Sequence, residues 1–209
     1  MTTFVLVPGM CHGAWCFDDL ADSLRDAGHR VLAVTLTGVA ERSHLMPGGV
    51  NLDTHITDVL AEIETRTAAT DKLVLVGHSY GGMVITAVAD RIPDRVDSLI
   101  FVDAVVPHDG EACWDLVNDE ERQWYVAVDD TGFGVPPMPF FDPRATSHPL
   151  ATVLQPLRLA GDLPRLCRLG IGLGVHAAGV PAFLRLGLLE LTFGCRRIVA
   201  RHRARHHAW

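Results

Sequence analysis

The stretch VLVGHSYGG, Val74–Gly82, contains the pattern Gly-x-Ser-x-Gly at Gly77–Gly81. An apolar run over Leu73–Val76 precedes it, and Gly81–Arg91 has the pattern of a helix that a proline closes. A serine hydroxyl is a poor nucleophile unless it is exposed and paired with a base. A tight strand-to-helix turn exposes it, and only small flanking residues tolerate the crowding. We therefore predict that Ser79 is a nucleophile; the alternative is that it merely caps the helix.

A second turn of the same kind lies near the start of the chain, in FVLVPGMCHGAWC at Phe4–Cys16. Its first four residues form an apolar strand pattern that Pro8-Gly9 ends. Acyl transfer needs N–H donors for the oxyanion that forms on the attacked carbonyl. We predict one donor at the backbone of Tyr80 and a second at the backbone of Met10. The two turns would then face each other across one active site.

The rest of the first half alternates short apolar runs with helical patterns. The expected strands are Phe4–Val7, Val31–Leu36, Leu73–Val76 and Leu99–Val102. Helical spacing spans Leu20 to Ala27 and Ile56 to Ile63, with Gly28 at the end of the first helix and Asn51 or Asp53 as N-cap of the second. Thr37–Val50 is expected to be a loop. Strands that are apolar on both faces and alternate with helices predict an α/β fold with a mostly parallel sheet covered on both sides.

The pattern changes over residues 108–160, which we call the insertion. Six prolines interrupt it, and tryptophan, tyrosine and phenylalanine residues lie between them. Ligand sites of open parallel sheets lie beyond the carboxyl ends of the strands. We therefore expect the insertion to form a lid with an apolar lining over that edge; the alternative is a loosely packed excursion that binds nothing.

Four stretches carry a family resemblance: VPGMCHGAWCF, GHSYGG, IFVDAVVPHDGE and HPLATVLQP. Together they resemble the α/β-hydrolase superfamily, in particular the plant methylesterase and hydroxynitrile lyase group and its bacterial esterase relatives. The resemblance covers about residues 3–162. It implies a single α/β-hydrolase domain over residues 1–209, with Ser79 as nucleophile, Met10 and Tyr80 as oxyanion donors, and no cofactor.

Two positions refine what the resemblance implies. Many members carry His-Gly where this chain has Pro8-Gly9, and the lyases carry a threonine at the position of Gly9. Because that threonine serves cyanohydrin chemistry, Gly9 favours ester hydrolysis over carbon–carbon cleavage. The resemblance also suggests that His12 holds the first turn by hydrogen bonds. Trp15 is expected to pack against the insertion or the core, and His78 to pack without acting as a base.

The acid and the base that should complete a catalytic triad are hard to locate. Such enzymes supply an acid and then a histidine after the insertion. His206 is the first candidate base, because His206-His207-Ala208-Trp209 distantly resembles the family's His-x-Ala-Met turn; His207 and His176 are the other candidates, and a fourth possibility is that no competent base is present. The candidate acids are Asp162, Glu190 and Asp103. The predicted function is hydrolysis of a small, fairly apolar carboxylic ester through an acyl-enzyme. The alternative is a catalytically impaired hydrolase-like protein that binds a ligand.

Residues 163–209 differ in composition from the rest of the chain. They contain eight arginines and a single acid, Glu190, with no lysine or aspartate. Translation of GC-rich DNA in a shifted frame tends to produce such a composition. One hypothesis is therefore a frame change near Leu163, which would replace the family's last two strands with an unrelated sequence, so that the last strands of the fold would be missing; the alternative is a natural divergent tail. Reading the coding DNA would decide between them. The apolar stretch Leu169–Leu184 is too short and too interrupted for a membrane span.

Composition limits the possible partners. The formal net charge of -7 over 209 residues argues against nucleic acid, which requires a basic face. The five cysteines are odd in number and scattered along the chain, which argues against a disulfide framework and favours a reducing, cytoplasmic location. Their spacing does not match a zinc site, so no metal is expected. The expected partner is a small-molecule ester, and the sequence does not indicate an oligomeric state.

Overall fold

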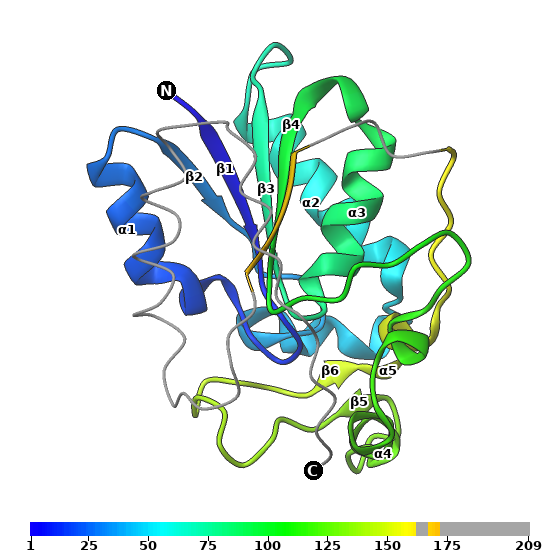
Figure 1. The fold of residues 1–209 in the computed structure, drawn as a ribbon. Helices are drawn as coiled ribbons and strands as arrows, with labels where there is room; N and C mark the ends of the chain where they lie inside the picture. Colours follow the sequence, from blue (N-terminus) through cyan, green and yellow to red (C-terminus); the bar gives the residue numbers. More distant parts are fainter. Residues whose placement is uncertain (162–166, 172–209) are drawn as a thin grey trace.

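A computed structural model describes residues 1–161 and 167–171 of the chain. Its main sheet has five parallel strands in the order β2-β1-β3-β4-β7 (Figure 1). The strands are β1 (Thr3–Val7), β2 (Arg30–Ala33), β3 (Leu73–His78), β4 (Val96–Val102) and β7 (Cys167–Ile171). The predicted α/β fold with a mostly parallel sheet is therefore confirmed.

Helices cover both faces of this sheet, as predicted. They are α1 (Asp18–Asp26), α2 (Leu52–Arg66) and α3 (Gly81–Arg91), and Figure 1 shows α1 on one side of the sheet with α2 and α3 on the other. Alternate residues of β1 join two separate cores: Phe4 and Leu6 pack with the side of α1, whereas Val5 and Val7 pack with the side of α2 and α3. A strand buried on both faces needs apolar residues at every position, which explains the continuous apolar run in the sequence.

Several boundaries differ from the prediction for local reasons. Strand β2 ends at Ala33 rather than Leu36, because Thr35 leaves the sheet: its hydroxyl accepts from the Ala14 N–H at 2.8 Å and its carbonyl accepts from Arg42 at 2.8 Å. The segment expected as a loop contains a 3-10 helix, η2 (Ala40–Gly48). Strand β4 begins at Val96, three residues earlier than predicted. The N-cap of α2 is Asn51, whose side chain accepts from the Thr54 N–H.

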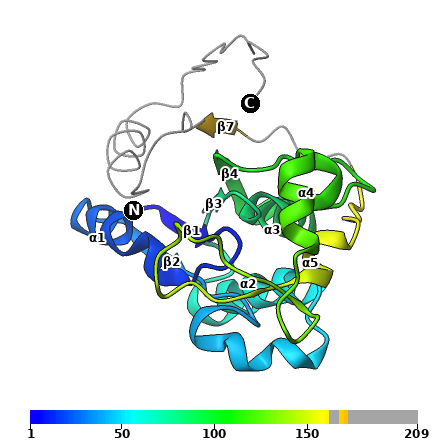
Figure 2. The ribbon, with the colours of Figure 1, turned by 90° about the horizontal axis from the view of Figure 1, so that it is seen from below.

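The insertion lies beyond the carboxyl ends of the strands, as predicted from the fold class (Figures 1 and 2). It contains a short 3-10 helix and two α-helices, together with a two-stranded antiparallel ribbon. These elements are η4 (Cys113–Leu116), α4 (Asp119–Val126), β5 (Gly134–Val135), β6 (His148–Pro149) and α5 (Leu150–Leu154). Trp124, Tyr125 and Val135 of the insertion pack against the core that α2 and α3 share with the sheet. This packing contradicts a loosely packed excursion; the role of a lid stays a prediction.

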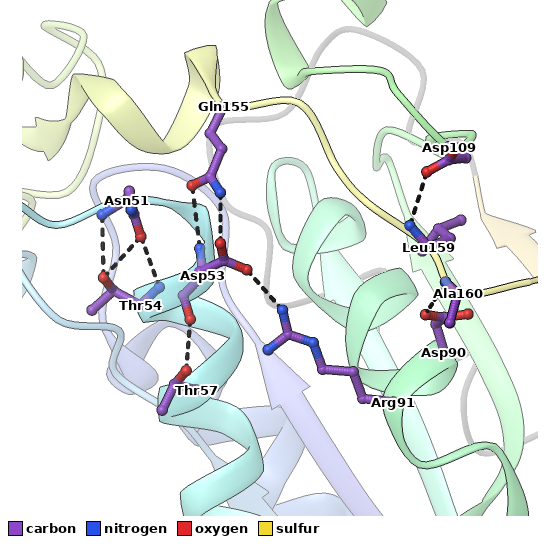
Figure 3. Close-up of polar contacts among 10 residues, drawn as sticks. All are labelled: Asn51, Asp53, Thr54, Thr57, Asp90, Arg91, Asp109, Gln155, Leu159 and Ala160. Atoms are coloured by element: carbon purple, nitrogen blue, oxygen red, sulfur yellow. Dashed lines mark hydrogen bonds and ion pairs between the residues drawn. The ribbon is translucent and has the colours of Figure 1, made fainter.

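Hydrogen bonds join the two ends of the insertion to each other and to helices α2 and α3. The Gly110 N–H donates to the Leu157 carbonyl, and the Leu157 N–H donates to the Glu111 carbonyl at 2.8 Å. Figure 3 shows the further contacts of the returning segment. Gln155 donates to Asp53 at the start of α2, and the same carboxylate pairs with Arg91 of α3 at 2.7 Å. The backbone N–H groups of Leu159 and Ala160 donate to Asp109 and Asp90.

Strand β7 was not anticipated, because Cys167–Ile171 contains an arginine and a glycine and shows no apolar run. It pairs with β4 and extends the sheet past the insertion. Within residues 1–161 and 167–171, no helix combines the length and apolar character that a membrane span requires.

Candidate active site

The turn at Ser79 has the strained geometry that the motif predicts. Ser79 has a φ of 51°, in the left-handed region that residues with a side chain rarely adopt. It lies between the end of β3 and the start of α3. A Cβ on Gly77 would meet the Gly81 carbonyl carbon at 2.8 Å, and a Cβ on Gly81 would meet the Val7 carbonyl oxygen at 2.5 Å. Both glycines of the motif are therefore required by close backbone contacts.

The two turns lie against each other. Strands β1 and β3 are adjacent and parallel, with Val7 paired to Gly77, so their carboxyl ends coincide. A Cβ placed on Gly9 would lie 2.9 Å from the Ser79 Cβ and 2.9 Å from His78 Nδ1. The first turn thus approaches the serine as closely as a glycine allows. A side chain at position 9 would require the turn to move.

The two predicted oxyanion donors flank this contact. Met10 follows Gly9 in the first turn, and Tyr80 stands at the N-cap of α3. Within the described part of the chain, neither backbone N–H donates a hydrogen bond to another residue. The N-terminal end of α3 also favours negative charge at this position. Both N–H groups are therefore left without an acceptor among the described residues.

A cavity of about 370 Å³ opens beside the serine. Ser79, Tyr80 and Asp103 lie on its sheet side, and the insertion contributes Cys113, Leu116 and Tyr125 among others. Burial raises the pKa of the Cys113 thiol to about 11, so this cysteine stays protonated at neutral pH. A small molecule held here would contact both the serine and the insertion, which contributes Glu121 as well as Leu116 and Val117.

Asp103, one of the candidate acids, lies in this cavity. It directly follows β4 and, like Ser79, has a positive φ, of 44°. Burial raises the pKa of its carboxyl group above the ordinary value. The remaining candidate acids, Asp162 and Glu190, and the candidate bases, His176, His206 and His207, lie outside the described residues.

The aromatic residues near the first turn have structural contacts. His12 Nδ1 lies 2.7 Å from the Met10 carbonyl, so it carries the proton that it donates, as expected of a residue that holds the turn. Trp15 packs under Arg144 of the insertion, with the guanidinium carbon 4.1 Å from the ring centroid. Burial lowers the pKa of His78 to about 4, which keeps this imidazole neutral at neutral pH.

Two buried histidines near the candidate site were not among the residues predicted from the sequence. His55 of α2 and His148 of β6 are both fully buried. Both rings lie edge-on to the Tyr80 ring, with centroid distances of 5.7 Å for His55 and 4.8 Å for His148. A signal for His55 existed: it falls with Leu52, Ile56 and Val59 on one helical face. His148 stood in one of the stretches that carry the family resemblance, but no local pattern indicated its contacts.

Because of these two buried histidines, we expect the protein to lose stability as the pH falls. Burial lowers the pKa of His55 to about 4 and that of His148 well below its ordinary value. The unfolded chain therefore binds more protons than the folded one between pH 6.5 and 4, so the free energy of unfolding falls as pH falls through this window. His55 alone is expected to remove about 3 kcal/mol across it. Urea denaturation at pH 7 and pH 5 should show about 2 kcal/mol of this loss, because pH 5 still lies above the folded-state pKa of about 4. A stability that is flat over the window would contradict the prediction.

The comparisons with known proteins place the chain in a family. The model described as alpha/beta hydrolase fold matches residues 2–135, so the protein belongs to that family. It is 54% identical over 117 residues to a carbendazim hydrolyzing esterase of Nocardioides sp. (strain SG-4G), covering 56% of this chain and 48% of that protein. It is 35% identical over 104 residues to esterase PIR7B of Oryza sativa subsp. japonica, covering 50% of this chain and 39% of that one.

Solved structures agree with the fold. An extracellular α/β-hydrolase from a Paenibacillus species superposes with a TM-score of 0.69 at 24% identity, over 83% of this chain and 78% of that one. A pyrethroid hydrolase from Sphingobium faniae JZ-2 gives a TM-score of 0.70 at 20% identity, over 91% and 96%. The chain spans about half the length of the curated relatives it matches.

Proposed function

We propose that this protein is a carboxylic ester hydrolase that uses Ser79 as nucleophile and forms an acyl-enzyme. The observation that carries the proposal is the contact of the two turns: a serine with a left-handed backbone faces the Gly9 turn beside a cavity. The proteins that it resembles include esterases and methylesterases from bacteria and plants.

In the proposed mechanism, a histidine takes the proton from the Ser79 hydroxyl as its oxygen attacks the ester carbonyl. The negative charge that develops on the carbonyl oxygen is held by the Met10 and Tyr80 N–H groups. When the tetrahedral intermediate collapses, the alcohol leaves with the proton from the histidine. Water then adds to the acyl group and delivers its proton to the same histidine. When the second tetrahedral intermediate collapses, the histidine returns this proton to the Ser79 oxygen and the acid is released.

The base of this mechanism is proposed at His206, with His207 and His176 as the other candidates, and Asp103 is available as an acid at the site. The substrate is proposed to be small and fairly apolar, because the insertion presents Leu116 and Val117 to the cavity. We also propose a cytoplasmic location, because Cys11, Cys16 and Cys113 are free thiols.

A fluorophosphonate probe tests the proposal, because it reacts only with a serine that its surroundings activate. We expect the probe to label the protein once, at Ser79, as located by mass spectrometry of the digested adduct. The Ser79→Ala variant should remain unlabelled. A protein that binds small apolar esters yet is never labelled at Ser79 would instead be the ligand-binding alternative.

A further inference from the structure

Cys11, the residue after Met10, has all of its polar groups engaged by the insertion. Its N–H donates to His148 Nδ1 at 3.3 Å, its carbonyl accepts from the Thr146 N–H at 3.1 Å, and its thiol points to the Val135 carbonyl at 3.8 Å. Cys11 is fully buried and has a φ of 68°, a left-handed conformation that costs free energy. The insertion therefore supplies the contacts that offset the strain of this turn.

The peptide group between Met10 and Cys11 is held at both of its polar ends. Its carbonyl, from Met10, accepts from His12 Nδ1 at 2.7 Å, and its N–H, from Cys11, donates to His148 Nδ1. Because the peptide unit is planar, two hydrogen bonds on opposite sides fix its orientation. The Met10 N–H belongs to the preceding peptide group, between Gly9 and Met10. The orientation of the Met10–Cys11 peptide sets ψ of Met10, and this limits the direction in which the Met10 N–H can point.

The protons on His148 can be assigned from its partners. A backbone N–H can only donate, so Nδ1 of His148 is unprotonated and accepts. In the neutral ring, Nε2 then carries the proton and donates to the Thr152 hydroxyl at 2.9 Å, and that hydroxyl donates to the Pro149 carbonyl at 2.7 Å. Burial favours this neutral form, because it holds the pKa of His148 well below its ordinary value.

The second turn joins the same buried cluster through the side chain of Tyr80. His55 Nε2 lies 2.8 Å from the Thr37 carbonyl and must donate to it, so Nδ1 accepts from the Tyr80 hydroxyl at 3.0 Å. The Tyr80 ring lies edge-on against His148, with centroids 4.8 Å apart. One residue of the insertion thus touches the turn of each proposed oxyanion donor.

We propose that His148 is a positioning residue for the oxyanion hole, which holds the Met10–Cys11 peptide in the orientation that aims the Met10 N–H at the reacting carbonyl. This inference rests on the proposed function. It makes the end of the insertion a fixed support of the catalytic turn rather than a cover that opens as a whole. His148 itself does not contact the reacting atoms.

A pair of variants separates positioning from packing. In His148→Asn, the amide oxygen occupies the place of Nδ1 and can still accept from the Cys11 N–H. In His148→Gln, the amide lies near the former Nε2 and the Cys11 N–H loses its acceptor. We expect His148→Gln to lower kcat for p-nitrophenyl acetate about tenfold or more with little change in KM, since misaligning an oxyanion donor acts on the transition state. His148→Asn should retain most of the activity.

Val153→Ala serves as the matched control, because Val153 is a fully buried residue of α5, the helix that directly follows β6, and makes no polar contact with Cys11. It should lower the melting temperature without lowering kcat. A His148→Gln variant whose kcat equals that of wild type or of Val153→Ala would overturn the inference. So would equal losses in kcat for the asparagine and glutamine variants at equal melting temperatures.

Amide hydrogen exchange tests the same contact without relying on activity. In the peptide that contains Met10 and Cys11, exchange should be faster in His148→Gln than in wild type and unchanged in His148→Asn. If wild type hydrolyses no ester, the proposed function fails, and this exchange result alone decides whether His148 holds the turn. Unchanged exchange in His148→Gln overturns the inference whatever the activity.

Discussion

Replacing Ser79 with alanine is expected to reduce ester hydrolysis by about 10⁴-fold or more. The nucleophile is lost, and only the oxyanion donors and the cavity remain to promote attack by water. The fold should persist, because alanine needs no more room than serine and the turn keeps its flanking glycines. The measurement is kcat/KM for p-nitrophenyl acetate, together with the melting temperature of both proteins.

Ser23→Ala is a suitable control for this experiment, since Ser23 lies on α1 and its hydroxyl donates to the Asp19 carbonyl within that helix. Its activity should match that of wild type. If the Ser79→Ala protein is folded and hydrolyses the ester at the wild-type rate, Ser79 has no part in the reaction. The contact of the two turns would then need another explanation.

Replacing Gly82 with alanine is expected to destabilise the fold by about 3 kcal/mol or more. A Cβ at this position would overlap the Val105 carbonyl oxygen. That carbonyl has little freedom to retreat, because the Val105 N–H donates to the Ser79 carbonyl at 3.2 Å, and the Gly82 N–H donates to the same oxygen at 3.1 Å. Urea denaturation measures the loss of stability, and hydrolysis should fall with it because Ser79 shares these contacts.

Two other glycines calibrate this effect. Gly28 has a φ of 84° with open space around its Cβ position, so Gly28→Ala should cost about 1 kcal/mol from backbone strain alone. Gly161 has open space and no positive φ, so Gly161→Ala should leave stability nearly unchanged. A Gly82→Ala protein as stable as the Gly161→Ala protein would contradict the prediction that the Val105 carbonyl leaves no room for a Cβ at position 82.

Much of the candidate site could be predicted because its signals are local. The elbow at Ser79 needs small residues within two positions on either side, and the turn at Gly9 directly follows a strand, so both are visible in short stretches of sequence. The asparagine cap of α2 and the glycine after α1 are likewise decided within one helical turn. The base proposed at His206 could not be tested in the same way, because it lies outside the described residues.

The amino-acid sequence by itself determined the alternation of strands and helices, the doubly buried sheet and the sharp turn at Ser79. These follow from side-chain periodicity and backbone sterics over a few residues. Only the tertiary structure decided that His148 bonds to Cys11, 137 positions earlier, and that Asp103 and Tyr125 share a cavity with the serine. Such contacts depend on how the insertion folds back over the carboxyl ends of the strands, a long-range arrangement that no local pattern of residues specifies.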